Sequence, residues 1–415
     1  MKILWVTSQE LPIISNDLGA QVSGFGGWVT NMLNMLKTEK DLKIGIAMVS
    51  SRVDKLWMKE IDSMYCFVAP DSGHKSISDK LRNEIIDFFD PDIIHIEGNE
   101  FQIQNAFTRT NVKTILSLQG ILLGYEPYQY GCMPIADYMF NSKCRTMIAS
   151  WVLYFRKHFK FNHRIGMETK SIQNVKYITG RTFWDKAYSH WLNPQAKYYP
   201  CNRILRPVFY KEKWSLNTMK PHSIFVGNGY SPLKGLHFAL KAVNLLKKEF
   251  PDITLNVAGL CPIYKGSLFS PKKYGYSSII KKMINDMGIE KNVHFLGKLL
   301  SDKMIDVMKK SNVYLLPSLI ENSPNTLGEA MLIGMPCVSA YTGGAPEMAI
   351  DENECLFYRA NDPYLLAWQI RRVFLDNNFA VKLGENARKH AEITHDPIKN
   401  KEAILKAYSD MLNNN

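Results

Sequence analysis

The stretch from Val313 to Glu347 constrains the fold of this chain more than any other. It reads VYLLPSLIENSPNTLGEAMLIGMPCVSAYTGGAPE. Its opening run, VYLL, is short and continuously apolar, which is typical of a strand buried on both faces of a parallel sheet. Pro324 forbids a continuous helix through the next loop, TLGEAMLIG predicts a helix that ends at Gly334, and CVSA predicts a second buried strand. This order of elements predicts an α/β fold with a parallel sheet.

Two carboxylates, Glu321 and Glu329, flank the start of this helix in the spacing E-x7-E. Asn325 or Thr326 is the predicted N-cap, and the first backbone N–H groups of a helix favour a phosphate. Carboxylates accept hydrogen bonds from sugar hydroxyls, so the pattern predicts an anion site beside a polyol site. The alternative is a capping carboxylate and a solvated glutamate. The NSPN loop and the glycine pair Gly343–Gly344 weigh against that alternative.

The segment ENSPNTLGEAMLIGMPCVSAYTGGAPE resembles the signature of the retaining glycosyltransferases of the GT-B fold, glycosyltransferase family 4 (group 1). The resemblance is strong over about residues 222–360 and diffuse over the first half. It implies an α/β architecture of two doubly wound, Rossmann-like domains that face each other across a cleft, with a C-terminal helix that crosses back to the first domain.

The predicted domains follow from this resemblance. An N-terminal, acceptor-binding domain is expected over 1–210 together with the last helix, at about 398–415. A C-terminal domain that binds a nucleotide sugar is expected over 218–397. Residues 207–220 are polar and lack periodicity, which predicts a linker.

Length and composition agree with two globular domains. The chain has 415 residues, of which 46% are hydrophobic and 22% charged. The net charge of +12 suits an anionic ligand, an anionic membrane surface or nucleic acid, but no nucleic-acid motif is present. Seven scattered cysteines predict reduced thiols. No secretory signal or spanning segment is visible, which predicts a cytoplasmic protein.

The first half alternates strand and helix signals, as in a doubly wound parallel sheet, where ligands bind beyond the carboxyl ends of the strands. Gly26 and Gly27 follow the first strand. The resemblance implies that this glycine loop faces the donor diphosphate, whereas the alternative is a flexible loop that leads into a helix. His95 and Gln119 stand near the ends of two later strands and are the predicted catalytic candidates there.

Gln119 occupies a position where members of the family often carry histidine. Glutamine cannot act as a general acid or base, although it can donate and accept hydrogen bonds. A histidine such as His95 after an apolar strand is equally typical of a packing residue. Arg181 follows another strand and is expected to reach a phosphate or an anionic acceptor, or else to pair with Asp185.

In the second half, Lys234 opens a helix and is the predicted diphosphate clamp. Asn228 stands where the family usually has arginine. The resemblance implies a donor site in which Glu321 contacts the sugar hydroxyls, Glu329 holds the ribose, and Lys234 stabilises the leaving diphosphate. Backbone groups complete the predicted donor set: Leu299 toward the base, and Asn325, Thr326 and Leu327 toward the diphosphate. No metal ion or other cofactor is required in this scheme.

Residues 151–164 read WVLYFRKHFKFNHR. As an amphipathic helix they would lie on an anionic bilayer, at the inner face of the plasma membrane. The alternative is a helix whose aromatic face belongs to the core.

The predicted function is transfer of a hexose from a nucleotide diphospho-sugar, with a UDP-sugar favoured, to an acceptor hydroxyl with retention. The acceptor would be a glycan or lipid-linked, in bacterial cell-surface polysaccharide or lipid-linked oligosaccharide synthesis. The alternatives are a nucleotide-sugar-binding protein without catalysis and a sugar-nucleotide epimerase. Nucleic-acid binding ranks third.

Overall fold

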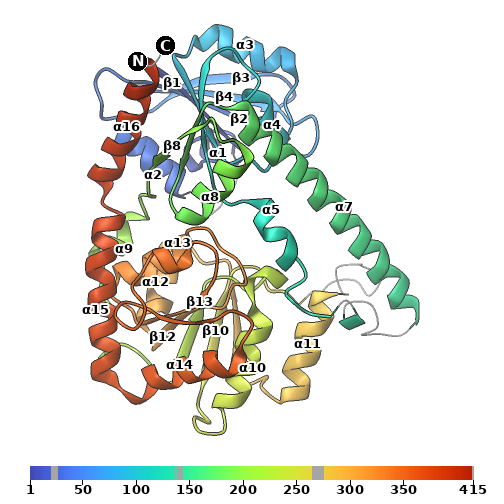
Figure 1. The fold of residues 1–415 in the computed structure, drawn as a ribbon, viewed down its shortest axis with the longest axis vertical. Helices are drawn as coiled ribbons and strands as arrows, with labels where there is room; N and C mark the ends of the chain where they lie inside the picture. The colour runs from blue at the N-terminus through green and yellow to red at the C-terminus, as the bar shows by residue number, and fades with distance from the viewer. Residues whose placement is uncertain (20–26, 135, 138–143, 264–274, 414–415) are drawn as a thin grey trace. The chain divides into compact units, whose positions relative to one another are not determined.

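A computed structural model describes residues 1–19, 27–134, 136–137, 144–263 and 275–413 (Figure 1). By their contacts these residues form two compact units. The first comprises Met1–Leu123, Phe161–Leu205 and His395–Asn415, and the second comprises Gly124–Lys160 and Arg206–Thr394. Both units are built on a parallel sheet, as the sequence predicts.

The first unit contains an eight-stranded sheet in the order β3-β4-β2-β1-β5-β6-β7-β8. Only the edge strand β3 is antiparallel to its neighbour. The strands are β1 (Lys2–Thr7), β2 (Lys43–Ser50), β3 (Trp57–Ile61), β4 (Met64–Pro70), β5 (Ile93–Glu97), β6 (Lys113–Ser117), β7 (Tyr177–Gly180) and β8 (Lys197–Pro200). Its central strands are buried on both faces, which explains their continuous apolar runs.

Helices cover both faces of this sheet. They are α1 (Pro12–Asp17), α2 (Gly27–Leu36), α3 (Asp79–Phe89), α4 (Gln102–Phe107), α8 (Phe183–Leu192) and α16 (Pro397–Asn413). The short α5 (Leu122–Tyr125) and the long α7 (Cys144–Asn174) each pass from one unit to the other. The last helix, α16, lies beside α2 (Figure 1). The two helices share one core, in which Tyr408 is fully buried. The C-terminal helix therefore packs on the first unit, as predicted.

The second unit contains a six-stranded parallel sheet in the order β11-β10-β9-β12-β13-β14. Its strands are β9 (Ser223–Val226), β10 (Thr254–Ala258), β11 (Val293–Gly297), β12 (Val313–Leu316), β13 (Cys337–Tyr341) and β14 (Leu356–Arg359). Its helices are α9 (Pro207–Lys211), α10 (Leu236–Leu246), α11 (Tyr276–Met287), α12 (Ser301–Lys309), α13 (Asn325–Leu332), α14 (Pro363–Leu375) and α15 (Asn377–Thr394). The strand order reverses between β9 and β12, so the loops that leave these two strands are neighbours.

The contact grouping differs from the predicted domain boundaries in two places. Gly124–Lys160 belong to the second unit, where Gly131 O lies 2.9 Å from Nε2 of His237 on α10. The predicted linker 207–220 begins with a helix, α9, which packs on α12 and α13. Arg206 already belongs to the second unit, four residues before the predicted end of the first domain.

Candidate functional site

Two loops meet at the reversal point of the second sheet. The loop after β9 ends in a 3-10 turn, Pro232–Lys234, and the helix α10 begins only at Leu236. Lys234 therefore precedes the helix rather than opening it, which corrects the prediction. Gly235, between the turn and the helix, has φ +66°, and a Cβ atom there would lie 1.8 Å from Pro317 O in the loop after β12. Only glycine permits this close approach of the two loops.

The approach of the loops brings Lys234 against Glu321. Lys234 Nζ donates to Glu321 Oε1 at 2.5 Å, and Ser318 Oγ donates to the same oxygen at 2.8 Å. The two charged side chains are 30% and 11% exposed, respectively. The structure thus joins two predicted site residues that lie 87 positions apart in the sequence.

The glycine pair holds the backbone of Glu321. Gly344 N donates to Glu321 O at 3.0 Å. Gly343 has φ +53°, and a Cβ atom there would lie 1.9 Å from the same carbonyl oxygen. The pair therefore fixes the loop from which the Glu321 side chain projects.

The start of α13 differs from the prediction in two details. The N-cap is Pro324, and Asn325 is already the first helical residue. The N–H groups of Leu327 and Gly328 donate to Pro324 O, at 3.0 and 3.3 Å. Leu327 N–H is thus already engaged, and Asn325 and Thr326 supply the leading N–H groups of the helix.

Glu329, the second carboxylate of the spacing, is buried on α13. Arg206 contacts both of its oxygens, with Nε 2.7 Å from Oε1 and Nη2 2.7 Å from Oε2. Burial raises the pKa of Glu329, and the Arg206 guanidinium opposes that shift. The carboxylate predicted to hold a ribose is therefore already bound on one side by a cation.

The two remaining residues predicted to bind the sugar donor, Asn228 and Leu299, follow strands of the same unit. Asn228 is exposed after β9, and its Oδ1 accepts from Tyr230 N at 3.0 Å. Leu299 is half-buried between β11 and α12, two residues before Ser301, whose Oγ accepts from Arg206 Nη1 at 3.2 Å.

The first-unit candidates have a different environment. Gly26 lies outside the described residues, and Gly27 begins α2. His95 is 2% exposed, stacks on Trp5 with ring centroids 3.8 Å apart, and has Nδ1 2.7 Å from the hydroxyl of Tyr408. These contacts favour the packing role for His95.

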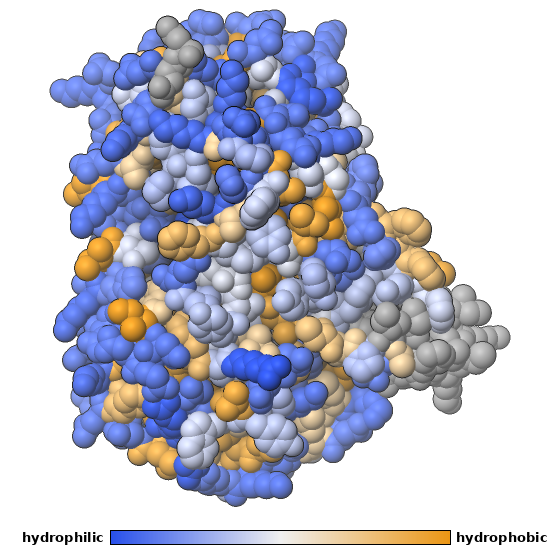
Figure 2. Space-filling view, in the orientation of Figure 1, coloured by the Kyte–Doolittle hydropathy of each residue, from blue (hydrophilic) through white to orange (hydrophobic). Residues whose placement is uncertain are grey.

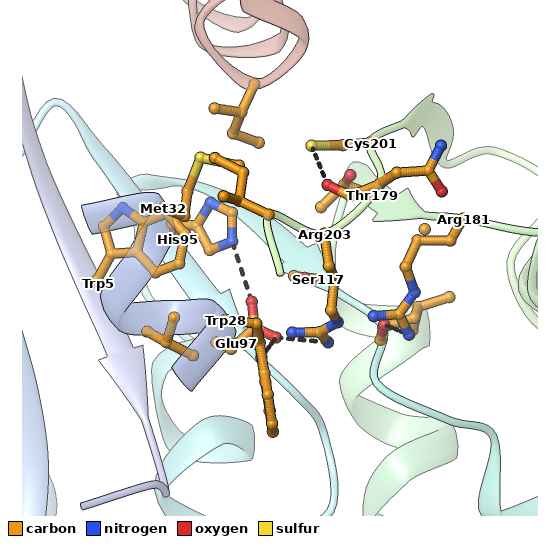
Figure 3. A pocket seen from close by; sticks show the side chains of 16 residues that line it. Trp5, Trp28, Met32, His95, Glu97, Ser117, Thr179, Arg181, Cys201 and Arg203 are labelled. Atoms are coloured by element: carbon orange, nitrogen blue, oxygen red, sulfur yellow. Dashed lines mark hydrogen bonds and ion pairs between the residues drawn. The ribbon is translucent and has the colours of Figure 1, made fainter. Parts of the chain in front are cut away.

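Gln119 Nε2 lies 3.4 Å from Oε1 of Glu97, a carboxylate that the sequence candidates did not include. Glu97 Oε1 also accepts from Trp28 Nε1 at 3.1 Å and from Arg203 at 2.9 Å (Figure 3). Arg203, and then His95, hold the pKa of Glu97 at about 2 against the opposing effect of burial. Glu97 is thus the centre of a buried polar cluster.

Arg181 lies beside this cluster, and its side chain does not form the pair with Asp185 that was the alternative to an anion-binding role. Its Nη2 donates to the carbonyl oxygens of Leu118 and Gln119, at 2.7 and 2.8 Å. Asp185 instead accepts from the backbone N–H of Arg181 at 3.0 Å.

Within the described residues, no group of three or more His, Cys, Asp and Glu side chains is placed to hold a metal ion. Positive charge near the predicted diphosphate site comes from Lys234 and from the start of α13.

Comparison with known proteins assigns part of the chain to a family. Residues 209–390 match the family described as glycosyl transferases group 1, and this range lies in the second unit. Residues 209–390 are a group 1 glycosyltransferase domain.

Curated relatives match this glycosyltransferase domain over part of their length. The D-inositol 3-phosphate glycosyltransferase of Corynebacterium glutamicum (strain R) is 29% identical over 168 residues, which are 40% of this chain and 38% of that protein. The protein of the same name from Paenarthrobacter aurescens (strain TC1) is 25% identical over 193 residues, which are 46% of this chain and 45% of that protein. The matched region thus covers less than half of these relatives.

Solved structures resemble the chain along its whole length. Sucrose-phosphate synthase from Thermosynechococcus elongatus has a TM-score of 0.72 at 14% identity, covering 99% of this chain and 98% of that one. HepE of Anabaena, solved with UDP-glucose, has a TM-score of 0.68 at 15% identity, covering 99% and 100%. At these identities the likeness concerns the fold. It confirms the predicted GT-B architecture of two Rossmann-like domains.

Arg206 is the residue of the second unit that sequence reasoning missed. It directly precedes Pro207, in a segment without periodicity, so no local pattern distinguishes it from a linker arginine. The available signal was indirect, because a glutamate inside a buried helix requires a cationic partner.

Proposed function

We propose that this protein is a retaining glycosyltransferase that uses a nucleotide diphospho-sugar, with a UDP-sugar as the favoured donor. The Lys234–Glu321 contact beside the start of α13 carries the proposal, because it joins a cation, a carboxylate and free helix N–H groups in one unit. A diphosphate, a sugar and a ribose present the complementary chemistry, namely anionic oxygens and two sets of hydroxyls. The match to group 1 glycosyltransferases supports the same function.

The proposed roles follow from charge and position. Asn325 and Thr326 donate backbone N–H groups to the diphosphate, and Lys234 stabilises the charge that develops on it as the anomeric bond breaks. Glu321 accepts hydrogen bonds from sugar hydroxyls and thereby positions the anomeric carbon. Glu329 accepts from the ribose with its remaining lone pairs while Arg206 holds its orientation. In this scheme Lys234 and the helix start provide the positive charge that a metal ion would otherwise supply.

We further propose that the acceptor is a glycan or is lipid-linked, and that α7 associates with an anionic membrane surface. On α7, Trp151, Phe155 and Phe159 are spaced four residues apart and are 40%, 44% and 70% exposed. Figure 2 shows apolar side chains among hydrophilic ones on the flank where α7 lies in Figure 1. Exposed Arg156 and Lys160 lie next to this aromatic stripe, an arrangement suited to anionic head groups. Among the described residues, no helix, α7 included, has a segment that is long and apolar enough to cross a bilayer.

Replacing Glu321 tests the function. With UDP-glucose as donor, we expect Glu321→Ala to lower sugar transfer by about 10²-fold while UDP binding persists, since the diphosphate contacts remain. Glu290→Ala, at an exposed position of the same unit, is the matched control and should match the wild type. Retained turnover in Glu321→Ala would contradict the assigned role.

The same assay separates the alternatives. A binding protein without catalysis would hold UDP but release none from UDP-glucose in the presence of glycan acceptors. An epimerase would interconvert UDP-sugars without any acceptor.

A further inference from the structure

A small cavity lies at the carboxyl edge of the first sheet. It measures about 40 Å³ and opens at the reversal point between β1 and β5. Residues at or just after the ends of three strands line it: Glu97 on β5, Ser117 on β6, and Gly180 and Arg181 at β7 (Figure 3). A water needs roughly 10–15 Å³ by this measure, so the cavity admits a group of a few heavy atoms.

The charged groups that line this cavity are unbalanced. Arg181 and Arg203 bring two guanidinium groups, which lie near each other in Figure 3, against the single carboxylate of Glu97. Burial, and then the nearby Arg181, lower the pKa of Arg203 to about 9, although Glu97 opposes this shift. Burial lowers the pKa of His95 and raises that of Cys201 to about 12, so both are neutral at pH 7.

Two further carboxylates, Glu100 and Asp185, stand near these groups but do not line the cavity. Asp185 accepts from the backbone N–H groups of Arg181 and Thr182, and from the hydroxyl of Tyr198 at 2.5 Å. Arg203, which pairs with Glu97 on one side, packs against Trp28 on the other. The centroid of the Trp28 ring lies 4.5 Å from the guanidinium carbon. One positive charge inside the cavity therefore has no anion facing it there.

Two polar atoms at the cavity also lack hydrogen-bond partners among the described residues. They are Nε of Arg181 and Oγ1 of Thr179, whose side chain is 3% exposed, whereas Nε2 of His95 lies 3.7 Å from Oε2 of Glu97. Buried polar atoms are rarely left without partners unless a ligand or water supplies them. Arg181 Nη2 is anchored on two backbone carbonyls, which fixes the guanidinium while its Nε–H remains available.

We propose that this cavity binds an oxyanion, a phosphate or carboxylate group, with Arg181 and Thr179 as its hydrogen-bond donors. An oxyanion supplies both the missing negative charge and the missing acceptors, and its size fits the cavity. If the protein is the transferase proposed above, on which this reading of the ligand rests, the oxyanion belongs to the acceptor. The acceptor is then an anionic sugar or an anionic lipid-linked glycan.

Titration of the full-length protein with inorganic phosphate, at constant ionic strength set with chloride, tests the site. The wild type should bind phosphate saturably, and Arg181→Gln should weaken binding by roughly tenfold or more, because a charge-assisted hydrogen bond is lost. Thr179→Val should weaken it in the same direction. Arg109→Gln, an exposed arginine of the same unit, should bind as the wild type does. UDP binding and circular dichroism establish that each variant is folded.

A second arm identifies the source of the oxyanion. With UDP-glucose as donor, sugar phosphates and uronates are compared with their neutral parent sugars. A preference for charged acceptors that disappears in Arg181→Gln supports the acceptor assignment. Arg181-dependent phosphate binding without that preference supports a site for free oxyanion and overturns the acceptor assignment.

Two further results are decisive. Phosphate binding that is equal in the wild type, Arg181→Gln and Thr179→Val overturns the site, whatever the transferase assay shows. Arg181-dependent phosphate binding in a protein that transfers no sugar upholds the site and counts against the proposed function instead.

Discussion

Arg206 and Glu329 form a two-point ion pair inside the second unit. Both N–O distances are 2.7 Å, and the side chains are only 18% and 4% exposed. Arg206 precedes α9, whereas Glu329 lies on α13, 123 positions further along the chain. Arg206 lies outside the E-x7-E segment, yet it orients Glu329, the second carboxylate of that segment.

Arg206→Met should destabilise the second unit. It leaves a buried carboxylate without its cation, and losing one partner of such a pair typically costs about 3–5 kcal/mol. The removed cation would also let the pKa of Glu329 rise further, because burial already raises it. Urea unfolding measures the change in stability, and UDP titration measures the effect on the donor site.

The control for Arg206→Met is Arg371→Met. Arg371 contacts both oxygens of Glu249 with similar geometry, at 2.7 and 2.8 Å, but the two side chains are more exposed, at 35% and 44%. We expect essentially no loss of stability there. Equal losses of stability in the two variants would mean that burial does not determine how much the Arg206–Glu329 pair contributes to the free energy of unfolding.

Gly343→Ala should disturb the loop that carries Glu321. The new Cβ atom would lie 1.9 Å from Glu321 O, so the loop must shift in addition to the cost of a positive φ. Overpacking of this kind costs about 1–3 kcal/mol. Gly297→Ala is the matched control, because its φ is also positive, at +73°, but nothing lies within 4 Å of the added atom.

Unfolding free energies and UDP-glucose turnover of the two alanine variants isolate the contact with Glu321. We expect a larger loss of both in Gly343→Ala. Equal losses would show that glycine is required at position 343 only for its backbone conformation, and not for the close approach to Glu321 O.

His237 should make the second unit less stable in acid. Its Nε2 lies 2.9 Å from Gly131 O, which can only accept, so Nε2 carries the proton and Nδ1 accepts from Tyr276. Burial lowers the pKa of His237 to about 4 from an ordinary 6.5. Between these values the unfolded chain binds a proton that the folded protein does not, so stability falls as the pH drops from about 6.5 to 4.

Unfolding free energies at several pH values check this prediction. Across this pH range His237 contributes at most about 3 kcal/mol to the free energy of unfolding. His237→Asn should remove this contribution, so the unfolding free energy of the variant should depend less on pH. His294→Asn, at an exposed histidine of β11, should leave the slope as in the wild type. Identical slopes in the wild type and His237→Asn would rule out a neutral, buried His237.

The double reversal Arg156→Glu and Lys160→Glu should reduce pelleting with anionic vesicles. Each basic residue near such a surface contributes about 1 kcal/mol to binding, so we expect vesicle binding to fall at least tenfold. The difference from the wild type should become smaller as salt is added. Phe159→Ser should reduce binding even in high salt, because it removes exposed apolar surface. Lys170→Glu, on an exposed position of the same helix, is the control. Unchanged pelleting in both the reversal and Phe159→Ser would refute membrane association through α7.

The sequence by itself determined the elements and the match of residues 209–390 to group 1 glycosyltransferases. Continuous apolar runs such as Val313–Leu316 predicted buried parallel strands, and the structure has β12 over those residues. The order of strand, loop, helix and glycine pair was sufficient to predict the GT-B fold, because each of these signals depends on residues close together in the chain. Lys234 and Glu321 were both predicted as site residues, because each stands in a recognisable local segment of the sequence.

Only the tertiary structure decided which distant residues meet. It paired Arg206 with Glu329, placed Tyr408 of α16 against His95, and assigned Gly124–Lys160 to the second unit. It also placed Arg181 and Arg203 at one cavity. These contacts depend on the order in which strands join a sheet and on where loops cross, and neither is encoded in local periodicity. The physical reason is that burial changes what a charged side chain requires, and burial is known only once the chain is folded.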